Sequence, residues 1–350
     1  MAMPELRLDL DVMERNAARI GNEVLGLGKL WRPHVKSHSQ PGIAKTLVDY
    51  GACGVTAANV AEVEVMATAG IPSVLLAHIA VAENQLDRLA AAGRQTHLLV
   101  TVDHYVQSEL YSAAAQRTGA EFHVLIDIDV GMQRTGVRPR VDASRLAVAT
   151  DRLPGVSVVG IMGYEGHLLT ITDPAEKKSA IFDAMNVLEQ SRDAIQQEGV
   201  CCDFVSAGGS GSFWMTGQHD AVTELQAGGG IFGDLFYTQA CGLNDVAPAL
   251  TLTADVVSRP SLDRAVLNCG RKAVNPVVHS PEVLNVVGAR IESLSAEHAV
   301  VSLEGAARDL KIGDSVRLVV GYSDHSILMH RHIHVYRGTE KVDVWPVIRG

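Results

Sequence analysis

The sequence lacks the features that mark secreted and membrane-spanning proteins. Its 350 residues include only five cysteines and no CxxC pair, which fits a reducing compartment better than a disulfide framework. No apolar run reaches the roughly 18 residues that cross a bilayer. The opening MAMPELRLDLD has no apolar core of a secretory signal. We therefore expect a cytoplasmic location and no membrane partner.

An excess of positive charge is also missing. The chain has 30 Lys and Arg against 40 Asp and Glu, a net charge of −10, and the two signs are interspersed. No basic stripe is present to neutralise a phosphate backbone, so nucleic acid is not expected as a partner. What the chain does have is apolar content. With 47% hydrophobic residues it can bury a substantial core, and its length indicates one large domain and a smaller one.

The main organising pattern extends from about residue 10 to 245, where short β-branched runs alternate with longer stretches of helical spacing. The strand candidates are Leu30–Pro33, Gly54–Ala57, Ser73–His78, Leu98–Val102, His123–Asp129, Ser157–Gly163, Phe204–Ala207 and Glu224–Ala227. The helix candidates between them include Val60–Ala69, Ala82–Ala92, Val106–Arg117 and Ala175–Glu198. Eight strands favour a (β/α)8 barrel over an open doubly wound sheet.

After about residue 246 the pattern changes to alternating strands joined by tight polar turns, as in LTLTADVVSRP and HIHVYRG. This indicates an antiparallel β domain over residues 246–350. The extended segment Leu6–Leu10 precedes the first helix, so we assign residues 1–9 to the same domain. The predicted fold class is α/β, with an N-terminal (β/α)8 barrel over residues 10–245 and a C-terminal antiparallel β domain.

The segment RPHVKSH contains the first candidate for chemistry. It places Lys36 just past the first strand, at the end of a barrel where active sites lie. A lysine there, flanked by Arg32, His34 and His38, can have a lowered pKa and form a Schiff base. The alternative is a surface lysine beside solvated histidines, because lysine is mostly exposed in proteins.

Two glycine-rich loops follow the last two strands. The segment VSAGGSGS ends at Ser212, and Gly228, Gly229 and Gly230 follow the next strand. Backbone N–H groups in such loops can bind a phosphate, although glycine clusters are more often plain turns. Loops after the seventh and eighth strands form the common phosphate site of barrel enzymes. Together with Lys36 they indicate a phosphorylated cofactor.

Further polar residues follow the fifth and sixth strands. In IDIDVGMQRTGV, Arg134 could hold a phenolate or carboxylate oxygen, and the alternative is a salt bridge within the barrel. In GIMGYEGHLL, Tyr164 offers a ring to contact a ligand, while Glu165 and His167 offer an acid and a base.

The ordered set of motifs resembles the D-serine dehydratase and D-threonine aldolase family, which are fold-type III pyridoxal-phosphate (PLP) enzymes related to alanine racemase. The resemblance is carried by RPHVKSHSQPGIAKTLVDYGACGVTAANVAEVEVMATAGI, VLIDIDVGMQRTGV, GIMGYEGH, VSAGGSGS, TELQAGGGIFGD, NCGRKAV and VYRGTEKVDVWPVIRG. These segments run over nearly the whole chain in the same order. The resemblance implies a barrel, a β domain and a homodimer with active sites near the subunit interface.

The resemblance also assigns residues. Lys36 matches the Schiff-base lysine, Arg134 a residue near the cofactor's phenolic oxygen, and Tyr164 a residue that contacts the ring. His167 is placed at the active site. The phosphate-binding residues that it implies are Gly208, Gly209, Ser210 and Gly211, with backbone groups of Gly230 and Ile231.

One departure concerns a divalent metal. Metal-dependent members resemble one another in a late His-x-Cys or His-x-Asp pair whose ion positions the substrate hydroxyl. Aligning back from VYRG puts Tyr322 and Asp324 at these positions, whereas sliding to the nearest histidine puts His325 first and Ile327 second. Only one conventional ligand remains in either register. Asp324 and His325 are therefore candidate ligands for Mn, Mg or Zn, and metal dependence stays open.

The resemblance implies a PLP-dependent lyase for D-β-hydroxy amino acids, acting through Lys36 as an aldolase or a dehydratase. The alternatives are an amino-acid racemase or epimerase on the same scaffold, and a PLP-binding protein without turnover. A further alternative is a barrel for an ordinary sugar phosphate, which would leave Lys36 unmodified. The sequence does not decide which D-amino acid is preferred.

Overall fold

The computed structural model describes residues 4–348, and these divide into two compact units. The barrel unit comprises residues 20–228, and the β unit comprises residues 4–19 and 229–348. The first boundary falls within helix α1 (Leu10–Gly26). The division into domains at residues 245 and 246 stays a prediction, and its residues 1–3 and 349–350 lie outside the described chain.

The barrel unit is built on eight parallel strands that follow one another around the sheet in chain order. They are β2 (Leu30–Trp31), β3 (Val55–Ala57), β4 (Ser73–Leu76), β5 (His97–Val102), β6 (Phe122–Asp127), β7 (Val156–Met162), β8 (Phe204–Ala207) and β9 (Glu224–Leu225). Each strand candidate from the sequence overlaps one of these. The barrel prediction is confirmed, with strands that are shorter by one or more residues in several cases.

Strand β2 closes the sheet although its regular part has only two residues. On one side it pairs with β9, Leu30 with Glu224 and Trp31 with Leu225. On the other side the chain beyond β2 bonds to β3, because the Val35 N–H donates to the Thr56 carbonyl at 2.8 Å and the Thr56 N–H donates to the Pro33 carbonyl at 2.9 Å. These bonds carry the segment that precedes Lys36 along the end of the barrel.

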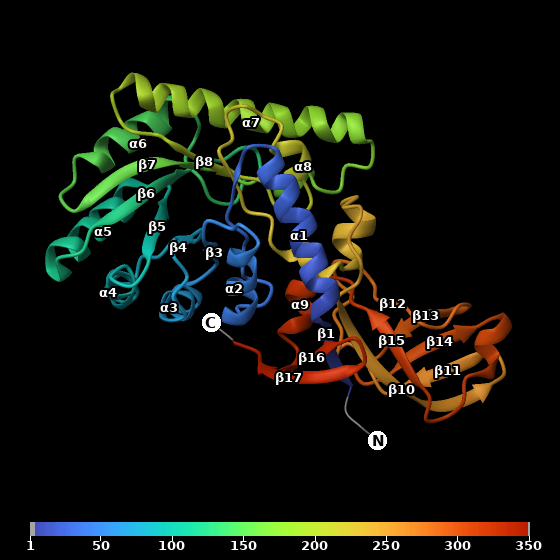
Figure 1. Ribbon diagram of the computed structural model, residues 1–350. Helices are drawn as coiled ribbons and strands as arrows, with labels where there is room; N and C mark the ends of the chain where they lie inside the picture. Colours follow the sequence, from blue (N-terminus) through green and yellow to red (C-terminus); the bar gives the residue numbers. More distant parts are fainter. Residues whose placement is uncertain (1–3, 349–350) are drawn as a thin grey trace. The chain divides into compact units, whose positions relative to one another are not determined.

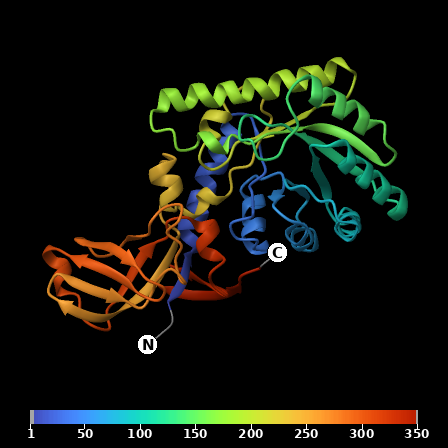
Figure 2. The ribbon, with the colours of Figure 1, turned by 180° about the vertical axis from the view of Figure 1, so that it is seen from behind.

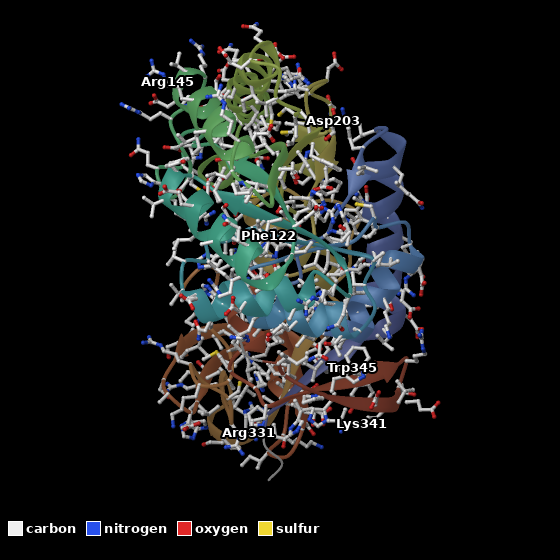
Figure 3. All side chains as sticks on the ribbon, turned by 90° about the vertical axis from the view of Figure 1, so that its left-hand side faces the viewer. Phe122, Arg145, Asp203, Arg331, Lys341 and Trp345 are labelled. Atoms are coloured by element: carbon white, nitrogen blue, oxygen red, sulfur yellow. The ribbon has the colours of Figure 1, made fainter. Side chains whose placement is uncertain are left out.

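The helices of the barrel unit lie around the outer side of the strands (Figure 1). They are α2 (Pro41–Asp49), α3 (Val60–Thr68), α4 (Glu83–Ala92), α5 (Tyr105–Thr118), α6 (Val141–Asp151), α7 (Pro174–Gln197) and the short α8 (Phe213–Thr216). Each long one has a buried face and an exposed face. In α6, for example, Ala143 and Ser144 are buried while Arg145 points outward (Figure 3). On the strands β4 to β7, the side chains of four residues form a buried apolar cluster, namely Leu75, Leu99, Leu125 and Met162.

The β unit contains a nine-stranded sheet. Its strands are β1 (Glu5–Asp9), β10 (Leu250–Ser261), β11 (Arg264–Leu267), β12 (Glu282–Val283), β13 (Ala289–Leu294), β14 (Ala299–Leu303), β15 (Ser315–Val319), β16 (His332–Arg337) and β17 (Glu340–Pro346). The strands β10 to β15 are visible together in Figure 2. The sheet is antiparallel except at β1, which pairs antiparallel with β10 and parallel with β16. Lys341 of β17 is exposed (Figure 3).

Short helical turns complete the two units. The barrel unit has η1 (Gly166–Leu168), and the β unit has η2 (Gly229–Phe232), the π-helical η3 (Phe236–Ala240), η4 (Gly305–Asp309) and α9 (Ser323–Ile327). Among residues 4–348, no helix combines the length and the apolarity that a membrane span requires.

Asn16 joins separate segments of the β unit. This buried side chain donates to the carbonyl oxygens of Ile231 at 2.9 Å and Ala247 at 2.7 Å, and it accepts from the Ala247 N–H at 3.0 Å. Asn16→Ala leaves these backbone groups without their partner, which costs about 3 kcal/mol of unfolding free energy. Chemical denaturation measures the loss. Asn84→Ala, at an exposed site on α4, is the matched control and should cost less than about 1 kcal/mol; equal losses would contradict the role given to Asn16.

Candidate active site

Lys36 lies in a turn at the carboxyl end of β2 and is exposed. The turn is held by backbone bonds, because the N–H groups of His38 and Ser39 both donate to the Val35 carbonyl, at 2.9 and 2.7 Å. The amine of Lys36 is therefore presented at the barrel end while its neighbours Ser37 and His38 are buried.

Arg32 has a structural role inside the barrel unit. Its Nε lies 2.7 Å from Glu224 Oε2 in a buried ion pair, and its Nη1 donates to the Ser73 hydroxyl at 2.8 Å. The Ser206 hydroxyl donates to the other oxygen of Glu224 at 2.8 Å. This network ties β2, β4, β8 and β9 together, so Arg32 is not one of the groups presented to a ligand.

The surroundings of Lys36 are cationic. Desolvation lowers the pKa of His34 well below its ordinary value, and the charges of Lys36, His38 and Arg134 lower it further. The imidazole of His34 is therefore neutral, and its Nδ1 accepts from the Lys36 backbone N–H at 3.2 Å. The positive charges of Lys36 and Arg134 thus both disfavour protonation of the His34 imidazole. A site with these positive charges suits an anionic ligand.

Arg134 and Tyr164 come together at the ends of β6 and β7. The guanidinium carbon of Arg134 lies 5.9 Å from the centre of the Tyr164 ring. The loop that carries Arg134 is shaped by Asp129, which accepts from the N–H groups of Gly131 at 2.9 Å and Gln133 at 3.0 Å. Arg134 makes no ion pair among the salt bridges found in residues 4–348, so the predicted alternative of a salt bridge within the barrel is not observed.

The glycine loop, defined here as Gly208–Gly211, follows β8 and packs against Tyr164. A Cβ atom added to Gly209 would lie 3.0 Å from Cε2 of the Tyr164 ring, so glycine gives the backbone an approach to the ring that is tighter than most side chains would have. Ser210 is buried within the loop, and buried Lys177 donates to the Gly211 carbonyl at 2.8 Å. The four residues predicted as a phosphate loop therefore form one compact, anchored segment beside Tyr164.

Glu165 anchors this loop, which is a role that the sequence did not reveal. The carboxylate is fully buried and accepts from the hydroxyls of Ser212 at 2.7 Å and Thr216 at 2.5 Å, and from the Gly208 N–H at 3.3 Å. Those donors use both of its oxygens, so the prediction of an acid–base pair with His167 does not fit Glu165. The only signal in the sequence was the pair of hydroxyl residues just after the glycines.

His167 lies elsewhere in the same neighbourhood. It is exposed in η1, and its Nε2 would be 3.1 Å from a Cβ atom on Gly131, which belongs to the loop of Arg134. The structure therefore brings His167 near that loop. Gly228 has a simpler role than the sequence suggested, because a Cβ atom there would collide with the backbone of His34.

Gly230 and Ile231 belong to the β unit, in η2. Both are buried, and the Ile231 carbonyl is bonded by Asn16. The contribution of their backbone groups to phosphate binding stays a prediction.

Asp324 and His325 also lie in the β unit, at the start of α9. Asp324 Oδ2 accepts from the Tyr322 hydroxyl at 2.7 Å, and the His325 ring packs against the Tyr322 ring at 4.9 Å between centres. Within residues 4–348, no group of three or more His, Cys, Asp or Glu side chains is placed to hold a metal ion. The donor set does not fit the divalent metal that the sequence left open.

Comparisons with known proteins identify the family of this chain. Residues 8–235 match the family model of the alanine racemase N-terminal domain, and residues 249–336 match that of a putative serine dehydratase domain. The chain is 30% identical to the 3-hydroxy-D-aspartate aldolase of Paracoccus denitrificans (strain Pd 1222) over 98% of its own length and 91% of the relative's. The chain belongs to the D-serine dehydratase and D-threonine aldolase family of fold-type III PLP enzymes.

Solved structures of this family agree with the fold. The crystal structure of D-threonine aldolase from Filomicrobium marinum superposes with a TM-score of 0.94 at 32% identity, covering 99% of this chain and 94% of that one. A variant of D-threo-3-hydroxyaspartate dehydratase in the metal-free form gives a TM-score of 0.87 at 22% identity, covering 100% and 98%. The second likeness shows the fold alone.

Pyridoxal 5′-phosphate is the cofactor of this family, and the barrel unit fits it. The close contact of Gly209 with Tyr164 leaves a backbone surface beside an aromatic ring, and Arg134 supplies a fixed cation at that ring. Lys36 supplies the amine, and its charge and that of Arg134 both act on the neutral imidazole of His34. These are the groups that an aldehyde with a phosphate and a phenolic oxygen requires.

Glu165→Gln tests whether the buried carboxylate shapes the cofactor site. Replacing a carboxylate that accepts three hydrogen bonds loosens the glycine loop, so the Kd for PLP should rise about tenfold. Titration of the apoprotein with PLP, followed by absorbance, measures it. Glu198→Gln is the control because Glu198 is exposed at the end of α7; an unchanged Kd in Glu165→Gln would contradict the anchoring role.

His38 makes stability depend on pH. Burial lowers the pKa of His38 to about 3 from an ordinary 6.5. Below pH 6.5 the unfolded chain takes up a proton that the folded chain refuses, so the unfolding free energy falls with pH by about 1.4 kcal/mol per unit. From pH 6.5 to 5 this residue alone should cost about 2 kcal/mol.

Denaturation of the wild type and of His38→Asn at pH 7 and pH 5 isolates the effect. The asparagine side chain would keep an acceptor for the Gln40 N–H, which donates to His38 Nδ1 at 2.8 Å, but it cannot be protonated. The drop in stability between the two pH values should be about 2 kcal/mol smaller in the variant. The same drop in both proteins would exclude a neutral, buried His38.

Proposed function

We propose that this protein is a PLP-dependent lyase that acts on D-β-hydroxy amino acids, as an aldolase or a dehydratase, through Lys36. The observation that carries the proposal is the position of Lys36, Arg134, Tyr164 and the glycine loop. They follow β2, β6, β7 and β8, at the carboxyl ends of parallel strands, where barrel enzymes hold their ligands. The family relatives support the same substrate class, since a 3-hydroxy-D-aspartate aldolase and a D-threonine aldolase are among them.

Each residue has a distinct task in this proposal. The Lys36 amine would hold the cofactor through its aldehyde and, with a substrate bound, would move a proton at the substrate Cα. The amides of the glycine loop bind the phosphate, Tyr164 contacts the ring, and Arg134 holds the phenolic oxygen or a carboxylate. When bound, PLP supplies an electron sink for the bond that breaks.

His167 is proposed to act on the substrate's hydroxyl side. Its exposed imidazole lies near the loop of Arg134 and is a group that can exchange a proton near neutral pH. Aldol cleavage needs a base at the hydroxyl, whereas dehydration needs an acid there, and one imidazole can serve either reaction.

The proposal includes the assembly and the location. A homodimer is proposed from the family resemblance, and a cytoplasmic location is proposed because the five cysteines lack the spacing of a disulfide framework. Gly230 and Ile231 are proposed to add backbone contacts to the phosphate.

Lys36→Ala tests the covalent attachment. The wild type should purify as a yellow protein, and borohydride should fix the cofactor on Lys36, found as a modified peptide by mass spectrometry. Lys36→Ala removes the amine and should be colourless and inactive. Lys45→Ala is the control, because Lys45 is exposed on α2, and it should keep both colour and activity. A colourless wild type that takes up no PLP would refute the proposed function.

The products formed from D-β-hydroxy amino acids test which reaction the protein catalyses. D-threonine, D-serine and D-3-hydroxyaspartate are incubated with the PLP-loaded protein, and aldehyde, keto acid and ammonia are measured. Aldehyde without ammonia identifies an aldolase, and keto acid with ammonia identifies a dehydratase. Loss of optical rotation alone would identify a racemase and overturn the proposed lyase.

A further inference from the structure

Tyr322 and Asp324 form a hydrogen-bonded pair in the β unit. The Tyr322 hydroxyl donates to Asp324 Oδ2 at 2.7 Å. Asp324 is 8% exposed, so its carboxylate is largely removed from water. A hydrogen bond to an ionised acceptor in such surroundings is stronger than one between neutral groups at the surface. The two side chains act together as one polar unit.

The residue between them is fixed by a second buried carboxylate. Asp234 Oδ2 accepts from both the backbone N–H and the hydroxyl of Ser323, at 2.8 and 2.6 Å. Asp234 Oδ1 accepts from the Tyr237 N–H at 3.0 Å. Asp234 is fully buried, and its oxygens are directed at these donors. It therefore sets the backbone from which Tyr322 and Asp324 project.

Aromatic packing holds the phenol in place. The Tyr322 ring lies 5.1 Å from the Phe236 ring, 5.8 Å from the Tyr237 ring and 4.9 Å from the His325 ring, each pair meeting edge to face. Such contacts limit rotation of the side chain. The phenol is thus positioned before any ligand arrives.

These groups are a poor set of ligands for a divalent ion. Zinc is bound by thiolate, imidazole and carboxylate, and magnesium and calcium by carboxylate and carbonyl oxygens. A neutral phenol belongs to neither set, and the ordinary pKa of tyrosine is about 10. The Tyr322 proton also occupies one of the two oxygens of the only carboxylate in the pair. Asp234 cannot complete the set because its oxygens already accept three hydrogen bonds.

We infer that the Tyr322–Asp324 pair does not hold a divalent metal. The inference goes beyond the proposed function, which leaves metal dependence open. The pair stands at the positions that the sequence register assigns to the metal ligands of metal-dependent members. Its phenol offers a hydroxyl that donates a hydrogen bond to the carboxylate, where a metal site would need an imidazole lone pair.

Metal binding is tested with the PLP-loaded protein after dialysis against a chelator. Mn²⁺ is titrated and bound metal is measured by atomic emission. The wild type should take up no stoichiometric Mn²⁺. Tyr322→His supplies an imidazole next to Asp324 and should bind Mn²⁺ stoichiometrically. Tyr50→His adds a histidine at an exposed site of the barrel unit and controls for nonspecific uptake.

Two results of that titration would overturn the inference. Stoichiometric Mn²⁺ in the wild type would show that the pair is a metal site. A folded Tyr322→His that takes up no metal would show that Tyr322 does not stand at a ligand position.

A protein that fails to load PLP at Lys36 would refute the proposed function, while the Mn²⁺ titration would still report on the Tyr322–Asp324 pair.

Discussion

The closure of the barrel through β2 is the constraint on which the rest of the site depends. Only Leu30 and Trp31 form a regular ladder, so the chain beyond them is held by bonds to Thr56 on one side and to Gln226 on the other. The buried pair of Arg32 with Glu224 reinforces the same seam. Because both edges of this segment are paired, the turn that carries Lys36 starts at a defined place at the barrel end. A lysine needs such a rigid support to meet a cofactor in a fixed orientation.

Buried carboxylates organise both units in a similar way. Glu165 accepts hydrogen bonds from the hydroxyls of Ser212 and Thr216 and from the Gly208 N–H, and thereby shapes the glycine loop. Asp234 does the same for Ser323 and the Tyr237 backbone, and burial raises its pKa to about 7. A buried carboxylate is costly unless donors surround it, and the same donors become ordered around it. Such groups explain how loops of small residues can present a rigid surface.

The β unit departs from the metal-dependent pattern that the sequence resemblance implies. A phenol bonded to a carboxylate stands at positions where that pattern has imidazole and thiolate or carboxylate. An imidazole nitrogen offers a lone pair to a metal ion, whereas a neutral phenol offers a hydroxyl that donates and accepts hydrogen bonds.

The sequence by itself determined the barrel, its eight strands, the change to β structure and the candidates Lys36, Arg134, Tyr164 and Gly208–Gly211, because hydrophobic period, glycine runs and ordered motifs are local properties of the chain. It assigned Glu165 to acid–base chemistry and Arg32 to the group around the lysine, and there the tertiary structure decided otherwise. Glu165 meets Ser212 and Thr216, and Arg32 meets Glu224, across many residues of chain. Which donors surround a charged side chain depends on packing between distant strands, and no local pattern records it.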